Sequence, residues 1–391
     1  MKKRLTGFLT AFFILLCFAV PVSGQEYAGG VSAKAAILIE ATTGRVLYAK
    51  NADSRLPMAS TTKIMSALLT LEQPNLDEYF TVDPDAIRVE GSSMGLVEGD
   101  QVTLRALAYG MLLPSGNDAA NAAAVKIGGT TENFIAMMNK RAELLGLSNT
   151  HFVTPSGLHD DAHYSTAKDM AMLTRAALKN PDFLAICSSK NAQLEFGNPP
   201  FKRWLKNSNK MLQNYEGAIG VKTGFTDEAG RCLVSAARRN GVTLICVTLS
   251  DPNDWQDTAN LFDYGFTQVS SHEIPASLAG EKTVKVTGGT QQECKVELYG
   301  AATTVVDLDQ LTAEFHLDRF YYAPIQAGDI VGRVDYLYEG EVVASQQLMA
   351  SETVEQKAPS EEEENMFSAF FSSIIGAFEA IVSFLQSFGQ N

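Results

Sequence analysis

A serine and a lysine three residues apart open an apolar segment of this chain. After Pro57, apolar residues recur at helical spacing at Ile64, Ala67, Leu68 and Leu69. This spacing predicts a mostly buried helix with Ser60 and Lys63 one turn apart near its start. A serine is a poor nucleophile at neutral pH, and a lysine can take its proton only where burial or a nearby cation lowers the lysine pKa. The pair is therefore either a nucleophile with its base or a helix cap beside a solvated lysine.

The first 24 residues have the three-part layout of a secretory signal peptide. Three cations at positions 2–4 precede an apolar run from Phe8 to Val20, which is short for a membrane span, and small residues follow it. We expect cleavage after Gly24, and a lipoprotein is excluded because Cys17 lies inside the apolar run. Cleavage removes three positive charges and takes the formal net charge from −14 to −17. Nucleic acid is therefore not an expected partner.

A second short motif lies between two predicted helices. The segment Thr103–Leu113 predicts a buried helix that ends at Pro114, and an alanine-rich helix follows a few residues later. Ser115 and Asn117 fall on the tight loop between these helices. We expect Asn117 or Asp118 to cap the second helix. A simple turn followed by a cap is the alternative interpretation of this loop.

Strand-like segments occur at both ends of residues 25–270, with helical segments between them. The predicted strands are Ala35–Glu40, Arg45–Lys50, Gly217–Thr226, Arg231–Ala237 and Val242–Leu249. A predicted helix, Trp255–Phe266, follows the last of them. This order predicts an α+β fold, in which an antiparallel sheet has helices on its faces. A hydrophobic content of 46% in 391 residues indicates two or three folded domains.

The cysteines and histidines do not form a recognisable framework. Cys187, Cys232, Cys246 and Cys294 remain after the signal peptide, without the spacing of a metal site. If Asn240-Gly241 forms a two-residue turn, Cys232 and Cys246 lie on opposite faces of a hairpin, so we expect buried thiols and no disulfide between them. The five histidines are scattered and no H-E-x-x-H sequence occurs, so no metal is expected.

Three short motifs in a fixed order carry a resemblance to a known family. They are Ser60-x-x-Lys63, Ser115-x-Asn117 and Lys222-Thr223-Gly224, the known signature of the penicillin-recognising serine enzymes. The surrounding sequence is similar to the low-molecular-mass penicillin-binding proteins, which are serine-type D-alanyl-D-alanine carboxypeptidases of the peptidase S11 type. The similar stretches are Leu56–Leu69, Gly91–Leu96, Met111–Asn121, Asn149–Leu158, Tyr164–Asp169 and Val221–Gly230. The resemblance runs from about Ser32 to the C-terminus and implies a β-lactamase/transpeptidase-like catalytic domain.

The resemblance also implies a mechanism that needs no cofactor. Ser60 would attack the peptide bond of a peptidoglycan stem peptide ending in D-Ala-D-Ala, and Lys63 would take its proton. Backbone N–H groups of Ser60 and Phe225 would form the oxyanion hole. Ser115 would pass the proton to the departing D-alanine, and Asn117 would orient Lys63 and the substrate amide. β-Lactam antibiotics would acylate the same serine.

The strand that carries the third motif is expected to bind the substrate. The peptide would lie along Lys222-Thr223-Gly224 as an added strand, with Gly224 allowing the two backbones to approach closely. Lys222 and Thr223 would bind the terminal carboxylate. One departure from the family pattern is the absence of an arginine from Asp251–Asp257, where the family often has one. Carboxylate recognition would then depend more on Lys222 and Thr223.

The last third of the chain changes in character. Residues 271–350 are rich in short β-like segments and predict a small β-sandwich, a spacer in this family, with carbohydrate binding as the alternative role. Residues 351–365 are acidic and predict a flexible linker. Residues 366–391 predict an amphipathic helix that anchors the protein in the plane of the membrane at its outer face, although this segment has no lysine or arginine. Folding of this helix back onto the protein core is the alternative.

The predicted anchor has one apolar side. At ~100° per residue, nine of its large apolar residues fall within an arc of roughly 120°. They are Phe367, Phe370, Phe371, Ile374, Phe378, Ile381, Val382, Leu385 and Phe388.

Other functions remain as alternatives. A class A β-lactamase needs a glutamate in an E-x-x-x-N sequence, but Glu195 is followed four positions later by Pro199, and no better candidate lies between Asn117 and Lys222. A DD-endopeptidase would use the same residues on a different bond. A non-catalytic wall-binding protein would not need all three motifs.

Overall fold

The computed structural model describes residues 27–300, 304–358 and 361–388, so the predicted signal peptide lies outside the described residues. The first domain is built on a five-stranded antiparallel sheet with the order β2-β1-β9-β8-β7. Its strands are β1 Ala35–Glu40, β2 Val46–Lys50, β7 Ala218–Thr226, β8 Gly230–Arg239 and β9 Val242–Leu249. The N-terminal hairpin therefore joins strands that lie about 200 positions later in the chain. This arrangement confirms the predicted α+β fold.

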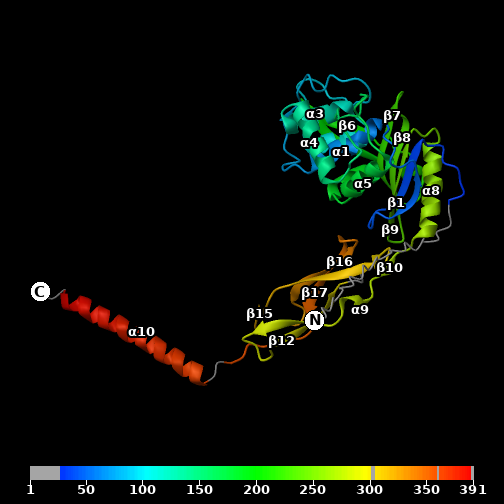
Figure 1. Ribbon diagram of the computed structural model, residues 1–391. Helices are drawn as coiled ribbons and strands as arrows, with labels where there is room; N and C mark the ends of the chain where they lie inside the picture. The colour runs from blue at the N-terminus through cyan, green and yellow to red at the C-terminus, as the bar shows by residue number, and fades with distance from the viewer. Residues whose placement is uncertain (1–26, 301–303, 359–360, 389–391) are drawn as a thin grey trace, which may run out of the picture.

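Helices cover both faces of this sheet (Figure 1). On one face lie the 3₁₀ turn η1 Ala59–Thr62, α1 Lys63–Leu71, α2 Leu104–Leu112, α3 Asn117–Gly128, α4 Thr131–Leu144, α5 Ala167–Leu178 and α6 Pro181–Cys187. On the other face lies α8 Asp254–Gln268, preceded in the chain by the short α7 Met211–Asn214. Strand β1 is buried along its whole length because its side chains alternate between two cores. Ile37 packs in the core shared with α1, and Leu38 packs in the core shared with α8.

The β8–β9 hairpin has the predicted two-residue turn at Asn240-Gly241. Arg239 is paired with Val242, and Ser235 is paired with Cys246. Cys232 packs in the core shared with α1 and Cys246 in the core shared with α8, so the two thiols lie on opposite faces of the sheet. The four cysteines that the structure describes are all free and buried, in agreement with the expected buried thiols.

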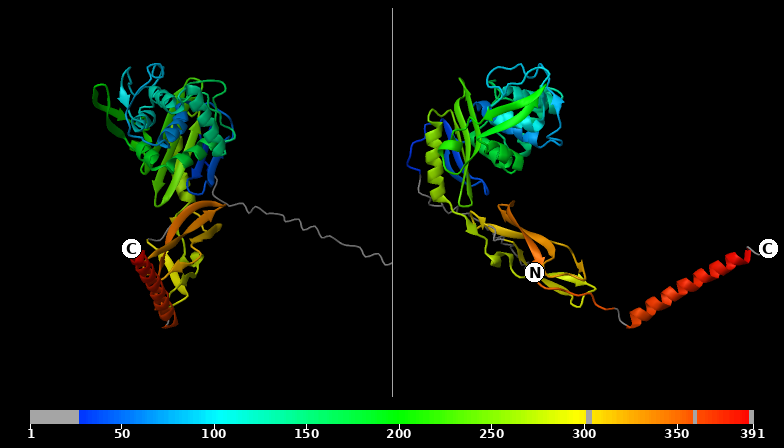
Figure 2. Two further views of the ribbon diagram at one scale, coloured as in Figure 1. Left: turned by 90° about the vertical axis from the view of Figure 1, so that its left-hand side faces the viewer. Right: turned by 180° about the vertical axis from the view of Figure 1, so that it is seen from behind.

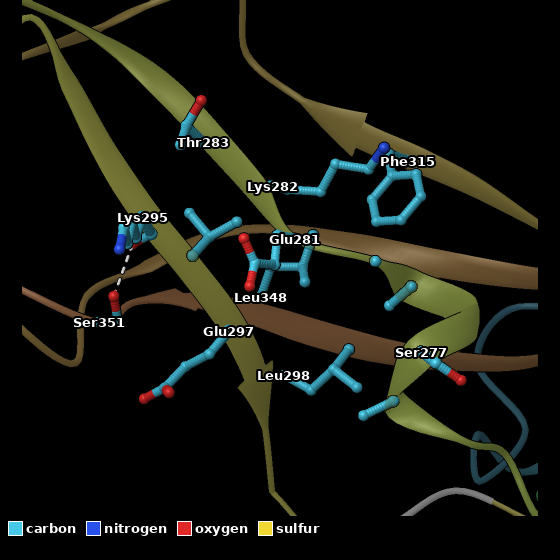
Figure 3. A pocket seen from close by; sticks show the side chains of 14 residues that line it. Ser277, Glu281, Lys282, Thr283, Lys295, Glu297, Leu298, Phe315, Leu348 and Ser351 are labelled. Carbon is cyan, nitrogen blue, oxygen red and sulfur yellow. Dashed lines mark hydrogen bonds between the residues drawn. The ribbon is translucent and has the colours of Figure 1, made fainter.

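The second domain is all-β apart from one short helix. Its main sheet has the order β14-β16-β17-β12-β11-β15, and β10 pairs with β13. The elements are β10 His272–Glu273, α9 Ala276–Ala279, β11 Lys282–Thr287, β12 Glu293–Tyr299, β13 Thr304–Val305, β14 Leu311–Leu317, β15 Tyr321–Tyr322, β16 Ile330–Tyr338 and β17 Glu341–Ala350. A pocket of about 820 Å³ lies between α9 and the strands, where the Lys282 ammonium lies 4.5 Å from the centre of the Phe315 ring (Figure 3). All residues that line this pocket belong to the second domain.

The second domain is attached to one end of the first, as Figures 1 and 2 show. Among the described residues, two ion pairs link the domains: Arg175 to Glu341 at 2.8 Å and Arg45 to Asp307 at 3.8 Å. The side chain of Arg175 also donates to the carbonyl oxygens of Ala41 and Thr42, in the β1–β2 turn. The contact therefore lies at the end of the sheet that carries this turn.

Two segments of regular structure are absent from the sequence-based prediction. Residues between α5 and β7, for which no strand is predicted above, contain α6 and a hairpin of β5 Asn191–Gly197 and β6 Pro200–Lys206. In β5 the apolar residues Ala192, Leu194 and Phe196 alternate with polar ones, as in a half-buried strand, whereas β6 is mostly exposed and lacks this pattern. Strand β14 was also missed, although its side chains alternate in burial. The remaining short strands are β3 Phe80–Thr81 and β4 Gln101–Val102.

The boundary before the C-terminal helix also differs from the prediction. Val354 is fully buried in the core of the second domain and exchanges backbone hydrogen bonds with Ile325. The Lys357 N–H donates to the Gly288 carbonyl oxygen at 2.8 Å. The prediction of a linker at residues 351–365 is therefore wrong for the first half of that segment, because those residues pair with the second domain. Helix α10 then begins at Glu361 rather than Met366 and ends at Phe388.

Candidate active site

Ser60 and Lys63 lie where η1 passes into α1. Ser60 is within the 3₁₀ turn and is partly exposed, whereas Lys63 is the first residue of α1 and is completely buried. The Lys63 Nζ atom lies 2.8 Å from Ser60 Oγ, 2.7 Å from Asn117 Oδ1 and 2.6 Å from the Ser156 carbonyl oxygen. A helix cap beside a solvated lysine is therefore excluded.

The surroundings of Lys63 favour its neutral form. Burial lowers its pKa well below the ordinary lysine value, and the positive charge of Lys222 lowers it further, while Asp118 opposes this shift. A neutral amine has two N–H donors and one lone pair. The two donors match the oxygens of Asn117 and Ser156, which leaves the lone pair for the hydroxyl hydrogen of Ser60. The contacts of this nitrogen therefore suit a base that removes a proton from Ser60.

Asn117 does not cap α3, contrary to the prediction, and neither does Asp118. Asn117 is the first residue of the helix, and its Nδ2 atom donates to the Glu90 carbonyl oxygen at 2.6 Å. The Asp118 carboxylate instead accepts backbone N–H groups from the loop at residues 94–96, at 2.9 to 3.0 Å. These contacts hold the loop and α3 together. The first turn of α3 therefore directs Asn117 toward Lys63 and Asp118 toward this loop.

Ser115 lies two residues before Asn117, in the turn between α2 and α3. Its side chain is buried, and its backbone has a φ of 68°, which is unusual for a residue other than glycine. Ser115 Oγ makes no hydrogen bond with Ser60 or Lys63 in the part of the chain that the structure describes. The structure thus brings Lys63 into contact with both Ser60 and Asn117, and Ser115 lies in the turn just before Asn117.

Strand β7 carries the third motif at the free edge of the sheet. Lys222 is buried, its Nζ donates to the Thr223 carbonyl oxygen at 2.8 Å, and burial lowers its pKa to about 7. A Cβ atom on Gly224 would lie 3.0 Å from the Met58 carbonyl oxygen and 3.1 Å from the Ser60 backbone nitrogen. A larger residue here would have to push the Ser60 turn away by a few tenths of an ångström, because β7 passes close to that turn. The sequence-based explanation, an approach by substrate, missed this contact.

Two further residues hold the site together without belonging to a motif. His163 is buried, and burial lowers its pKa to about 4, so its ring is neutral. Its Nδ1 accepts the Val153 N–H at 2.9 Å, which leaves Nε2–H to donate to Thr62 Oγ1 at 2.7 Å. Ser208 Oγ lies 2.8 Å from Thr223 Oγ1. His163 thus joins the Ser60 turn to the segment that carries Ser156, and Ser208 contacts the outer side of β7.

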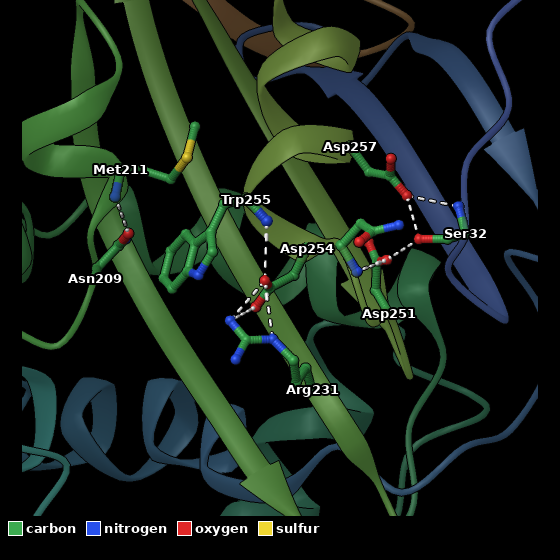
Figure 4. A network of polar contacts seen from close by, with 9 residues as sticks. Ser32, Asn209, Met211, Arg231, Asp251, Asp254, Trp255 and Asp257 are labelled. Atoms are coloured by element: carbon green, nitrogen blue, oxygen red, sulfur yellow. Dashed lines mark hydrogen bonds and ion pairs between the residues drawn. The ribbon is translucent and has the colours of Figure 1, made fainter.

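The segment that lacks the expected arginine is occupied by internal contacts (Figure 4). Asp254 accepts three hydrogen bonds from Arg231, at 2.7 to 3.0 Å. Ser32 Oγ lies 2.6 Å from Asp251 Oδ1 and 2.7 Å from Asp257 Oδ2, and burial raises the pKa of Asp251. These carboxylates bind the N-terminal segment and β8, and the one arginine drawn there is already paired.

Comparison with known proteins gives consistent matches. Residues 22–253 match the sequence profile of the peptidase S11 family, described as D-alanyl-D-alanine carboxypeptidase, and residues 275–356 match that of the C-terminal domain of penicillin-binding protein 5. The D-alanyl-D-alanine carboxypeptidase DacF of Bacillus subtilis is 32% identical over 90% of this chain and 95% of its own length. DacC of Escherichia coli is 32% identical over 91% of this chain and 93% of its own.

Solved structures agree with these matches. The crystal structure of the Streptomyces K15 DD-transpeptidase is 37% identical, covers 61% of this chain and 98% of that one, and has a TM-score of 0.59. The D-alanyl-D-alanine carboxypeptidase DacD of Francisella tularensis is 27% identical, covers 84% of this chain and 95% of that one, and has the same TM-score of 0.59. With the family profile matched across the sheet, helices α1 to α7 and all three motifs, this chain belongs to the S11 family of D-alanyl-D-alanine carboxypeptidases.

Proposed function

We propose that this chain is the serine-type D-Ala-D-Ala carboxypeptidase of a bacterial cell wall, with Ser60 as its nucleophile. The observation that carries the proposal is the buried Lys63 amine, whose contacts to Asn117 and Ser156 leave its lone pair directed at Ser60. The substrate is a peptidoglycan stem peptide ending in D-Ala-D-Ala. β-Lactams acylate the same residue.

The reaction has two stages. Ser60 Oγ attacks the carbonyl carbon of the penultimate D-alanine as Lys63 takes the hydroxyl proton, and the N–H groups of Ser60 and Phe225 stabilise the negative oxygen. The C–N bond then breaks, and the proton passes through Ser115 to the amine of the departing D-alanine. Water attacks the resulting ester, gives one proton back through Lys63, and releases the shortened peptide and Ser60. Asn117 orients Lys63 throughout.

The substrate is bound as an extra strand along β7. The free edge of this strand offers backbone groups to an extended peptide, next to the Ser60 turn. Lys222 and Thr223 bind the terminal carboxylate, and Ser208 supports the Thr223 hydroxyl. An ammonium at Lys222 is the form that attracts a carboxylate.

The pKa of Lys222 predicts a fall in activity at alkaline pH. Since this pKa is lowered to about 7, the ammonium is present below pH 7 and is lost as the pH rises. kcat/KM for D-Ala-D-Ala peptides should therefore decrease above about pH 7. In Lys222→Arg the guanidinium stays protonated, so the decrease should move to higher pH. A decrease that is unchanged in Lys222→Arg would contradict this assignment.

Release of D-alanine tests the proposed activity directly. The purified protein should release one D-alanine per pentapeptide and leave the remaining tetrapeptide uncut, whereas an endopeptidase would cut cross-linked peptides. Incubation with penicillin should add one antibiotic mass to the intact protein, and this adduct should persist for many minutes. Rapid loss of the adduct with multiple turnovers of penicillin would indicate a β-lactamase. Absence of both reactions would indicate a wall-binding protein.

We also propose how the chain is arranged around this activity. Residues 1–24 direct export, residues 25–270 form the catalytic unit, and residues 271–350 with the paired segment up to Lys357 set it away from the membrane. Helix α10 then holds the protein at the outer face of the cytoplasmic membrane. An 18-residue window of this helix, Asn365–Val382, has a mean hydropathy of 1.5, and none of it is buried.

An in-plane position of α10 is supported by its pattern. Phe367, Phe370, Phe371 and Phe378 are 58 to 67% exposed, which is unusual for side chains of this size in a soluble monomer. Ser368, Ser372 and Glu379 lie on the opposite side of the helix by spacing. The predicted members Leu385 and Phe388 lie outside the described side chains. The apolar side would enter the bilayer while the polar side faces water.

Removal of α10 should release the protein from membranes without reducing its peptidase rate. A chain that ends at Ala358 keeps the buried Val354 and the Lys357 backbone pairing, so it should remain folded. The full-length mature protein should float with uncharged liposomes and resist high salt, because the attraction is mainly apolar. A full-length protein that stays in the soluble fraction would contradict the proposed anchor. Unfolding of the shortened chain would place α10 in the protein core.

A further inference from the structure

The far end of the second domain lies where the chain passes into α10 (Figure 1). At this end β15 pairs with β11, and Lys357 pairs with Gly288 just beyond β11. Helix α10 begins four positions after Lys357. Any surface that binds α10 therefore comes close to this end of the domain, which we call the tip: Lys285, Arg319, Phe320, Tyr322 and Lys357.

Two aromatic rings project from the tip. Tyr322 is 72% exposed and Phe320 is 45% exposed, and their rings meet edge to face with centroids 5.3 Å apart. They belong to the β15 segment, whose neighbour Tyr321 is directed inward and packs against the core of the domain. An exposed pair of rings costs free energy in water. Aromatic side chains with a polar end are, however, enriched where a protein meets the headgroups of a bilayer.

Cations surround these rings. Lys285, Arg319 and Lys357 line a shallow basin of about 730 Å³ together with Phe320, and the basin contains one carboxylate, Glu293. Glu293 accepts a hydrogen bond from Thr283 at 3.2 Å. Among the residues that the structure describes, none of the three cations forms an ion pair. The tip therefore presents free positive charge beside exposed aromatic rings.

The tip carries positive charge, whereas the apolar part of α10 has none. Residues 365–391 contain no lysine or arginine, and four glutamates occupy positions 361–364 at the start of α10. These glutamates would repel an anionic membrane surface, and the three cations of the tip lie in the same part of the molecule. Charge and apolar surface, which a single amphipathic anchor usually combines, are here divided between the helix and the tip.

We infer that the tip is a second membrane contact: it rests on the headgroups of an anionic bilayer, with Phe320 and Tyr322 at the interface and Arg319, Lys285 and Lys357 near lipid phosphates. The inference rests on the proposed tether through α10. It adds an orientation to that tether, because two contact points hold the second domain with its tip toward the bilayer. The catalytic domain, attached at the opposite end, then faces away from the membrane.

Binding to vesicles separates the tip from the helix. We would compare full-length mature protein with Arg319→Gln/Lys357→Gln and Phe320→Ser/Tyr322→Ser, on phosphatidylcholine vesicles and on vesicles with added phosphatidylglycerol. The charge variant should bind anionic vesicles about 5- to 30-fold more weakly and neutral vesicles equally well. The aromatic variant should bind both more weakly. Lys140→Gln/Lys202→Gln and Tyr299→Ser, which change exposed residues elsewhere, should match the unmodified protein.

A fluorescence measurement reports the position of the tip itself. The chain has two tryptophans, Trp204 and Trp255, and both lie in the first domain. A tryptophan introduced by Phe320→Trp should be quenched by brominated lipid, and one introduced by Tyr299→Trp should not. Equal quenching at the two positions would overturn the inference.

The outcomes also distinguish the tip from the tether. If the unmodified protein binds neutral vesicles and both tip variants match it on all vesicles, the tip inference is wrong and the tether stands. If the unmodified protein binds neither kind of vesicle, the tether and the tip contact are both wrong. If only the charge variant is weakened, the cations of the tip contact anionic headgroups and the proposed placement of Phe320 and Tyr322 at the interface is wrong.

Discussion

Ser60→Ala should abolish covalent labelling by penicillin and lower the rate of D-alanine release on the order of 10⁴-fold or more. The change removes only the oxygen that forms the acyl-enzyme. The variant should remain folded because Ser60 is partly exposed and the turn around it is held by Thr61, Thr62 and His163. The measurement is intact-protein mass after incubation with penicillin, together with the rate of D-alanine release.

Ser54→Ala is the matched control for this experiment. Ser54 is an exposed serine in the turn that precedes the motif, and its replacement should leave labelling and turnover unchanged. If the Ser60→Ala protein still carries a penicillin adduct, another residue is the nucleophile. A map of the labelled peptide would then identify it.

Replacing Lys63 should have the second-largest effect and should also change the pH profile. In the unmodified enzyme at saturating substrate, where the charge of Lys222 no longer limits binding, the acylation rate should rise with pH as Lys63 loses its proton. It should level off well below ~10.4, the pKa of a free lysine, because burial and Lys222 lower the pKa of Lys63. Lys63→Met keeps the length of the side chain but has no base, so acylation should fall about 10²- to 10⁴-fold and lose this rise.

Two variants control for charge and folding. Lys63→Arg keeps a cation that cannot act as a base, so it should be as inactive as Lys63→Met. Lys168→Met removes a surface lysine paired with Asp53 at 3.6 Å and should retain normal acylation. An acylation rate that continues to climb through pH 10 in the unmodified enzyme would exclude Lys63 as the base. So would a rise with pH that survives in Lys63→Met.

Much of the fold could be predicted because its signals are local. The pairing of β8 with β9 follows from Asn240-Gly241, and the ends of α2 follow from Thr103, which caps it, and Pro114. Strands β5 and β14 carry apolar residues at alternate positions but were not recognised as strands, whereas β6 lacks this alternation. The paired segment after β17 was missed because its composition is polar and acidic, and one buried residue, Val354, decides its position.

The candidate site also has parts that could be predicted from local sequence and parts that could not. Ser60 and Lys63 are close in sequence, so their contact follows from helical spacing. The parts that depend on distant segments could not be inferred: Ser156, His163 and Ser208 reach the site through loops that no sequence pattern links to the motifs. Asp118 was expected at most to cap a helix. Its role in holding the loop could not be predicted, because its partners are backbone N–H groups 22 to 24 residues away. The roles of individual site residues are predictions that substitution of each residue will test.

The four buried thiols allow unfolding of the chain to be followed by their reaction with an alkylating reagent. Burial raises the pKa of Cys187 to about 12 and that of Cys232 to about 11, and it raises the pKa of Cys294 as well, so little reactive thiolate exists while the protein is folded. Cys232 and Cys246 lie in the catalytic sheet, whereas Cys294 lies in the second domain. The rate of alkylation at each cysteine therefore measures the unfolding of the domain that contains it, without an introduced probe.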